Sequence, residues 1–386
     1  MLLLTRENLL TEKTRLALSV SGIALTVLLI TMLVALYRGW DEKVGTFVAQ
    51  SSVDVWVTSP GARDFLGAAS LLPVEGPDAV DAHAYLNDHE AVAAWSPLIV
   101  RPMDVWRIEA VVDGSEKQGQ RIDALFIGFD PLTGLGGPLR VVEGRGDAWF
   151  GEIIVDSALS QRYGVEIGDV LRAAGKDWTV VGKSQGGDFV GTQTVFAHHD
   201  HAQAALGMVG ATTFYAVSLV DGTDAREFAD EIVERAPDEI VAYTRDEFAG
   251  NTRERVLGDV LPLLVVVLGL AFVVGMTVAG LTVYTSTVAH SREYGILKAV
   301  GFGDGYLYRL VVEKSVIMTV LGFGAGILVA FAIAPLITNY VPQFVVHIRW
   351  QDVCGIFGAT LVMAVAAAYL PIRRIADLDP VSVFAA

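Results

Sequence analysis

The sequence predicts an integral membrane protein of four transmembrane α-helices, with an α+β extracytoplasmic domain inserted between the first two. Composition is one reason: 53% of the 386 residues are hydrophobic, only 19% are charged, and mean hydropathy is +0.48, a balance that is rare in soluble proteins. The distribution of the hydrophobic residues is the other reason, because one long apolar run precedes a long polar segment and three more follow it. Each run is close to the roughly 20 residues that a helix needs to cross a bilayer.

The predicted organisation follows the positions of these runs. Its parts are a tail (1–15), the first transmembrane helix (16–37), the extracytoplasmic domain with helical stalks at both ends (38–259), the second transmembrane helix (260–289), a loop (290–314), the third transmembrane helix (315–338), a short outer loop (339–352), the fourth transmembrane helix (353–370) and a second tail (371–386).

The first run is interpreted as an uncleaved anchor. Its 22 uncharged residues exceed the roughly 7–15 of a signal-peptide core, and the bulky segment Tyr37–Trp40 follows it in place of a cleavage site. Pro262 lies near the start of the second run, where a helix tolerates proline. The interior of each run is free of ionisable residues, which argues against a proton- or ion-coupled transporter.

Basic residues in the short segments predict the orientation. One set comprises Arg6, Lys13, Arg15, Arg292, Lys298, Arg309, Lys314, Arg373 and Arg374, whereas the outer loop 339–352 holds Arg349 alone. The positive-inside rule therefore places both termini and the 290–314 loop in the cytoplasm. Segment 38–259 is then extracytoplasmic, and because Cys354 is the one cysteine, no disulfide can form within the chain. These features suggest a prokaryotic cytoplasmic (inner) membrane.

The outward segment is strongly acidic. Residues 38–259 hold 18 Lys and Arg against 36 Asp and Glu, a net charge of −18. Such a domain repels nucleic acid and anionic lipid headgroups, so nucleic acid is excluded as a partner and lipid contacts are expected at the helices. Alternating patterns predict strands at 53–57, 104–112, 121–129, 152–155, 170–173, 178–181 and 215–220, helices at 156–163, 200–206 and 224–235, and loops at 58–80, around Asp113-Gly114 and at 131–138.

The loop between the second and third apolar runs is the main candidate site. Residues 291–301 read SREYGILKAVG, and helical geometry places Ile296, Leu297 and Val300 on one face, with Glu293 in the same sector. A carboxylate among apolar side chains needs a cationic partner if it is buried. The segment is therefore either a docking helix for another protein or an interfacial helix that lies on the membrane.

This segment resembles the signature of FtsX-like permeases, the membrane subunits of MacB-type ABC transporters. The closing stretch 370–381, LPIRRIADLDPV, resembles the terminal motif of that family, and the four-helix layout with one large outward loop is similar. Glu143-Gly144-Arg145 and Ile153–Val181 resemble the extracytoplasmic core domain of the family. The resemblance is specific over 255–386, weaker over 140–206, architectural over 1–57, and not detected over 58–139.

The resemblance implies that 291–301 is a coupling helix resting on a separate ATPase, and that two permeases pair with two ATPases. The residues predicted to form the ATPase contact are Arg292, Glu293, Tyr294, Gly295, Ile296, Leu297, Lys298 and Gly301. Arg373 and Arg374 are predicted to anchor the cytoplasmic end of the fourth transmembrane helix. The chain is expected to be non-catalytic and to bind no cofactor, with ATP and Mg²⁺ used by the partner. An extracytoplasmic adaptor or effector is a further candidate partner.

Three functions remain open at this point. The first is a permease subunit for export or extraction of a substrate, and the second is a non-transporting regulator that activates an envelope partner such as a cell-wall hydrolase. The third is a membrane-anchored metalloenzyme using His198 and His201, which could reach one zinc ion if helical, although the neighbouring Asp200 also suits a helix N-cap.

Other short motifs are weaker. Gly182-Lys183-Ser184 lacks the upstream glycine of a phosphate-binding loop, and Gly301–Tyr306 lacks the third glycine of a dinucleotide fingerprint. The spacings Gly322/Gly326 and Gly275/Ala279 allow close helix approach, either between two copies in a homodimer or within one bundle.

Overall fold

The structure is a computed structural model that describes residues 13–66, 70–74, 77–109, 117–187, 189, 192–236, 238–340 and 346–376. The chain forms two compact units. One combines Met1–Gly39 with Val260–Ala386, and the other is Trp40–Asp259.

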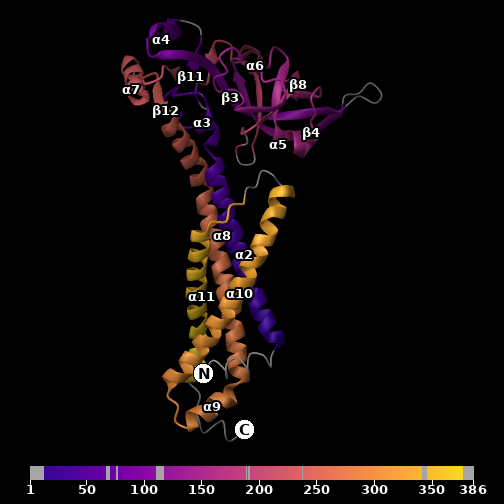
Figure 1. The fold of residues 1–386 in the computed structure, drawn as a ribbon, viewed down its shortest axis with the longest axis vertical. Coiled ribbons are helices and arrows are strands. Elements are labelled where there is room, and N and C mark those ends of the chain that lie inside the picture. Colours follow the sequence, from indigo (N-terminus) through magenta and orange to yellow (C-terminus); the bar gives the residue numbers. More distant parts are fainter. Residues whose placement is uncertain are drawn as a thin grey trace. The chain divides into compact units, whose positions relative to one another are not determined.

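The first unit is a bundle of long helices. They are α2 (Lys13–Lys43), α8 (Arg245–Ala289), α10 (Asp304–Tyr340) and α11 (Trp350–Ala376), with the short helix α9 (Ser291–Ala299) between α8 and α10 at one end of the bundle (Figure 1). The last residues of α2, from Trp40, and the first turns of α8, up to Asp259, belong to the second unit. Within the described part of the chain, four helices are long and apolar enough to cross a membrane, at Ala17–Gln50, Arg245–Ala289, Asp304–Ile337 and Trp350–Tyr369. This confirms the four predicted membrane helices.

The second unit is built on a mixed sheet. Its strands are β1 (Val55–Thr58), β3 (Val92–Glu109), β4 (Lys117–Phe129), β5 (Arg140–Gly144), β6 (Glu152–Asp156), β7 (Val170–Ala173), β8 (Lys176–Gln185), β9 (Gln193–His198), β11 (Phe214–Leu219) and β12 (Val241–Thr244). The order is β12-β1-β11-β3-β4-β9-β6-β8-β5, and β7 pairs with β3 and β8. Pairs β4/β9 and β6/β8 are parallel. The short strands β2 (Leu72–Pro73) and β10 (Ala211–Thr212) form a separate sheet.

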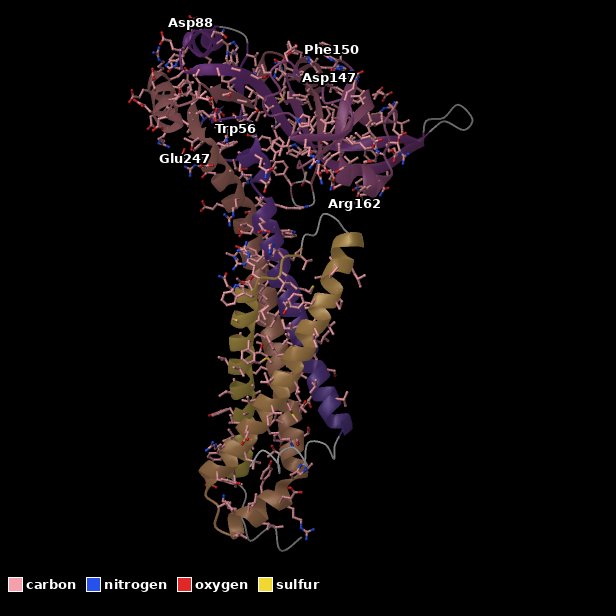
Figure 2. All side chains as sticks on the ribbon, in the orientation of Figure 1. Trp56, Asp88, Asp147, Phe150, Arg162 and Glu247 are labelled. Atoms are coloured by element: carbon pink, nitrogen blue, oxygen red, sulfur yellow. The ribbon has the colours of Figure 1, made fainter. Side chains whose placement is uncertain are left out.

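Strand alternation divides the core of this unit between two faces. In β1, Val55 and Val57 point to one face, where they pack with helices α4 (Pro77–Asp88) and α7 (Ala225–Arg235). Trp56 points to the other face and joins an aromatic cluster that includes Phe65 and Phe248 (Figure 2). Helices α5 (Ser157–Tyr163) and α6 (His199–Leu206) help enclose a third cluster against the other half of the sheet. The predicted α+β domain is confirmed.

Most of the local predictions in this unit are confirmed to within a few residues, and the helix caps explain two of the boundaries. Asp156 accepts the N–H of Ala158 at the start of α5, and Asp224 accepts two N–H groups at the start of α7. The predicted cap at Asp200 is wrong. The ring of His198 caps α6 by accepting the Asp200 N–H, so the helix begins one residue earlier than predicted.

The prediction of a surface loop at 58–80 is partly confirmed, because residues 59–66 and 70–71 form no helix or strand, but it is wrong in two respects. Phe65 is fully buried, and its N–H donates to the hydroxyl of Thr252 on α8 at 3.0 Å. Strand β2 and the start of α4 also lie in this range. The Gly, Pro and Ala residues of this segment show no clear periodicity. The sequence therefore did not indicate β2 or α4, because few of their described side chains enter the core. The turn predicted at Asp113-Gly114 lies outside the described residues.

Candidate functional site

Helix α9 follows α8 after one residue, His290, and is the helical part of the predicted docking segment (Figure 1). Val300 ends the helix, and Gly301 follows with φ +100°, a left-handed conformation that favours glycine and stops the helix from continuing. The side chain of Lys298 then pairs with Asp304, the first residue of α10, at 3.2 Å. These features fix α9 as a separate element at the turn between two membrane helices.

One face of α9 is held by the bundle. Tyr294 is only 6% exposed and packs in a cluster with Val283 of α8, Leu307 and Val311 of α10, and Ala368 of α11. Leu297 packs at the edge of the same cluster. Burial, with a contribution from the adjacent Glu293 charge, raises the pKa of the Tyr294 hydroxyl, so the ring stays neutral.

The opposite face of α9 is open. Ile296 is 44% exposed and Val300 is 73% exposed, and the exposed charges Arg292 and Glu293 lie on the same side. Phe302, 40% exposed, continues the apolar surface and contacts the ring of Tyr306 at 4.8 Å between centroids. We refer to Arg292, Glu293, Ile296, Val300 and Phe302 as the α9 surface.

This arrangement corrects the predicted helix face. Ile296, Leu297 and Val300 do not act together, because Leu297 turns toward the bundle while the other two turn outward. The ring of Tyr294 and the backbone of Gly295 are buried, so neither offers a side-chain contact to a partner. Val300 and Phe302 were not among the predicted contact residues. The residue that could have indicated the buried face is Tyr294, because its large side chain is the one that packs into the bundle.

The second predicted feature of this end of the molecule is the basic pair. Helix α11 continues through Arg373 and Arg374 to Ala376. The side chains of both arginines lie outside the described residues, so their anchoring role stays a prediction.

A second set of polar contacts lies within the second unit, between the first turns of α8 and earlier segments of the same unit. On α8, Arg245 pairs with Asp54 and donates to the carbonyl of Val53 at 2.8 Å, while Arg255 pairs with Asp64 at 3.0 Å. The Asp64 side chain is only 6% exposed, and its pairing compensates the cost of burying a carboxylate. Arg253 similarly pairs with Asp41 on α2 at 2.5 Å. The local sequence did not predict these pairs because the partners are far apart along the chain.

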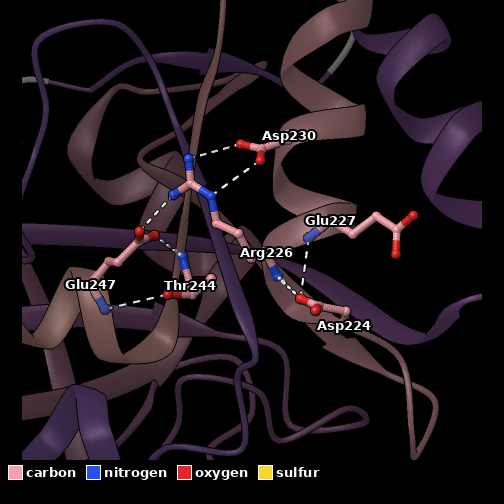
Figure 3. Close-up of polar contacts among 6 residues, drawn as sticks. All are labelled: Asp224, Arg226, Glu227, Asp230, Thr244 and Glu247. Atoms are coloured by element: carbon pink, nitrogen blue, oxygen red, sulfur yellow. Dashed lines mark hydrogen bonds and ion pairs between the residues drawn. The ribbon is translucent and has the colours of Figure 1, made fainter.

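Arg226 lies on α7, contacts Glu247 on α8 directly, and is connected through Glu247 to β12. Its guanidinium contacts both oxygens of Asp230 on α7 at 2.9 and 3.2 Å and one oxygen of Glu247 on α8 at 2.6 Å (Figure 3). The other Glu247 oxygen accepts the N–H of Thr244 in β12 at 3.0 Å. Because Arg226 is 56% exposed, water and salt screen these ion pairs, and they act chiefly to fix the geometry.

The histidine cluster has structural contacts. The His198 ring caps α6 and stacks on Phe150 at 4.7 Å, while Nδ1 of His201 accepts the N–H of Gly151 at 2.6 Å. His199 is buried between Asp200 and Thr212. Among the described residues, no group of three or more metal-binding side chains is placed to hold an ion. Lys183, from the motif that resembles a phosphate-binding loop, is held by Glu143 and Glu166 at 3.0 and 2.6 Å.

Comparison with protein families decides the assignment. Residues 16–235 match the MacB-like periplasmic core domain, which is more than half of the chain, and residues 265–380 match the FtsX-like permease C-terminal domain. The chain belongs to the MacB-type FtsX-like permeases. The match over 16–235 also crosses 58–139, where the sequence motifs had shown no resemblance.

Two ABC transporter permeases and one solved structure are among the proteins that this chain resembles. The permease is 24% identical over 227 residues to an uncharacterized ABC transporter permease of Methanocaldococcus jannaschii, covering 56% of this chain and 57% of the relative. The chain therefore spans just over half the length of that relative. It is 22% identical over 377 residues to an uncharacterized ABC transporter permease of Mycobacterium tuberculosis, covering 97% and 96% of the two chains. The periplasmic region of MacB from Actinobacillus actinomycetemcomitans aligns with a TM-score of 0.35 and 9% identity, over 51% of this chain and 91% of that one.

The small-residue pairs of the permease serve packing within one chain. A Cβ at Gly326 would lie 2.6 Å from the carbonyl oxygen of Ala24 on α2, and one at Gly322 would lie 2.6 Å from Ile23 on α2. A Cβ at Gly275 would likewise meet Thr26 at 2.5 Å. The spacings were interpreted either as contacts between two copies or as packing within one bundle, and these contacts support packing within one bundle.

Proposed function

We propose that this permease couples ATP hydrolysis by a separate ATPase subunit to movement of the outward unit, for export or extraction of a substrate. In this proposal the chain itself is non-catalytic, and ATP and Mg²⁺ bind to the partner. Both termini and helix α9 face the cytoplasm, residues 38–259 lie outside the cytoplasmic membrane, and the predicted spans 16–37, 260–289, 315–338 and 353–370 lie in the bilayer.

The observation that carries the proposal is the α9 surface. Ile296, Val300 and Phe302 present apolar area, and Arg292 and Glu293 border it with charges of both signs. A helix lying on a membrane would bury such apolar residues in lipid with its charges on the opposite side. A protein interface instead combines an apolar centre with a charged rim that sets orientation. The mixed face therefore favours a docked protein.

The contacts around α9 and α8 suggest how motion could be transmitted. Tyr294 connects α9 to α8, α10 and α11, so displacement of α9 would act on the bundle. Helix α8 is continuous from Arg245 to Ala289, and its outer turns are held by Asp54, Asp64 and Asp41. Pairing of two permeases with two ATPases, and contact with an extracytoplasmic adaptor or effector, belong to the same proposal and are supported by the family resemblance.

The test is a charge reversal on the exposed face. The full chain, affinity-tagged in its native host, is purified in mild detergent together with the ATPase that accompanies it, and the ATPase rate of the complex is measured. Glu293→Lys and Val300→Asp should each remove most of the stimulation of the ATPase, because the first places a reversed charge opposite its partner and the second places an unpaired carboxylate in the apolar centre of the contact. Membrane insertion and thermal stability should not change, since both side chains are exposed.

The matched control is Glu227→Lys. Glu227 is an exposed carboxylate in the first turn of α7, so the same charge reversal is made in the outward unit. This variant should retain ATPase stimulation. If Glu293→Lys and Val300→Asp both stimulate the ATPase as the unmodified chain does, the proposed contact is wrong.

A further inference from the structure

The outward unit contains a pocket between helices α4 and α7, next to the short strand β2. It has a volume of 1260 Å³, which exceeds the roughly 300–1,000 Å³ of typical small-molecule sites. Residues from α4, β2, β11 and α7 line it, and the segment after α7 completes the rim. The pocket therefore has room for an organic molecule of drug size.

The floor and one wall of this pocket are apolar. Leu72, Tyr215 and Ile240 are almost completely buried and line it together with Ile232. The Tyr215 hydroxyl donates to the carbonyl of Pro73, and its ring packs against His83 and Trp95, so these contacts hold the side chain in place at the pocket. An apolar floor of this kind stabilises a ligand by burying its hydrocarbon surface.

The rim of the pocket is acidic. Asp88 at the end of α4 (Figure 2), with Asp238 and Glu239 after α7, are exposed lining residues. Within the described part of the chain, none of these three carboxylates has an ion-pair partner. Three unpaired negative charges around an apolar floor attract cations and repel anions.

The one arginine in the lining is already engaged. The guanidinium of Arg235 lies 4.2 Å from the ring centre of Tyr85 and 3.9 Å from a carboxylate oxygen of Glu231. Burial, with the Glu231 carboxylate, raises the pKa of Tyr85 to about 12, so its ring remains neutral. The Tyr85 face is thus occupied by the chain's own guanidinium, which leaves the rim carboxylates as the groups that attract a bound cation.

We propose that this pocket binds an organic cation with an apolar body, which places its charge near Asp88, Asp238 and Glu239 and its hydrocarbon part on the floor formed by Leu72, Tyr215 and Ile240. The inference concerns the outward unit alone and does not depend on ATPase docking at α9. A failure of one proposal therefore leaves the other in place.

The test uses ethidium, a planar organic cation whose fluorescence rises when it leaves water. Ethidium is titrated into the full chain in a nonionic detergent, and the dissociation constant is obtained from the fluorescence. In the triple variant Asp88→Asn, Asp238→Asn, Glu239→Gln, the dissociation constant should rise at least tenfold. The unmodified chain should bind more weakly at 500 mM than at 50 mM salt, and the triple variant should lose this salt dependence.

Two further variants locate the binding. Ala84→Trp fills the pocket from an exposed position on α4 and should abolish ethidium binding. The matched control Asp221→Asn, Glu227→Gln, Glu254→Gln removes three exposed carboxylates that do not line the pocket and should bind as the unmodified chain does. Thermal unfolding confirms that each variant is folded.

Three results would overturn the proposal. One is the absence of saturable ethidium binding to the unmodified chain. Another is unchanged binding by Ala84→Trp, which would place the ligand elsewhere. The third is equal affinity for the triple variant and the control, which would show that the carboxylates do not select a cation.

Discussion

At the scale of single residues, Gly45 is a position in the second unit that requires glycine. It has φ +85° and separates α2 from α3 (Thr46–Gln50). A Cβ at this position would lie 2.9 Å from the carbonyl oxygen of Ala249 on α8. Glycine is therefore needed both for the left-handed backbone and for the close approach of the backbone at Gly45 to α8.

We predict that Gly45→Ala destabilises the permease. Left-handed backbone costs an L-residue about 1–2 kcal/mol, and the contact with Ala249 adds to this. The thermal unfolding midpoint of the purified chain should fall by several degrees. The matched control is Gly250→Ala, since Gly250 lies inside α8 with open space around it, and alanine there should be neutral or stabilising. Equal midpoints for the two variants would contradict the assignment.

His199 gives a prediction for pH dependence. Burial lowers its pKa below the ordinary value of about 6.5, although the adjacent Asp200 acts in the opposite direction. The unfolded chain therefore binds more protons than the folded chain once the pH drops below about 6.5, and stability is lost as the pH continues to fall. His199→Gln should flatten the decline of the unfolding midpoint between pH 7 and pH 5.

The control for this experiment is His198→Gln. The His198 ring caps α6 and stacks on Phe150, so this variant measures the stability lost when a histidine contact of the same helix start is removed. A decline in His199→Gln as steep as in the unmodified chain would show that another group is responsible.

At the scale of elements, glycines on α10 determine how α2 packs. Gly326 and Gly324 lie two residues apart, but only Gly326 faces α2, and the space around Gly324 is open. We predict that Gly326→Leu lowers the unfolding midpoint, because overpacking costs about 1–3 kcal/mol, and that Gly324→Leu is tolerated. If Gly326 instead formed a contact between two copies, Gly326→Leu would dissociate the dimer in crosslinking experiments without changing the unfolding midpoint.

The elements also show what could be predicted from the sequence. Helices with a clear apolar stripe, such as α7 with Phe228 and Ile232, were found because their periodicity is local. Helix α4 was missed because its pattern is weak, and Leu86 is its one fully buried large side chain among the described residues. The pairing of β7 with both β3 and β8 depends on contacts far apart in the sequence, which local patterns do not encode.

The candidate site shows the same limit. Sequence motifs located α9 and its charges, but not the face it presents. Spacing alone grouped Ile296 with Leu297, whereas the side chain of Tyr294 fits a space made by α8, α10 and α11 and turns Ile296 outward. That space is a property of the assembled bundle. The pocket beside α4 was missed for the same reason.

At the scale of the whole molecule, charge is divided unevenly along the chain. The segment 38–259 has a net charge of −18, whereas the short segments around α9 and the two tails carry most of the remaining basic residues. Basic residues in short segments favour retention of those segments in the cytoplasm during insertion, whereas a long domain is translocated largely regardless of its charge. The asymmetry therefore predicts opposite sides of the membrane for α9 and the sheet unit.

Cysteine labelling tests this orientation directly. Cys354, the one native cysteine, is exposed and is first replaced by alanine. Single cysteines are then introduced at Asp221, an exposed position in the sheet unit, and at Gly303, an exposed position beside α9 with open space around it. In intact cells, a membrane-impermeant maleimide should label the Asp221→Cys variant and should reach the Gly303→Cys variant only after permeabilisation. Labelling of Gly303→Cys in intact cells would show that the topology is the opposite of the predicted one. Helix α9 would then lie outside the cytoplasm, where an ATPase has no access to ATP.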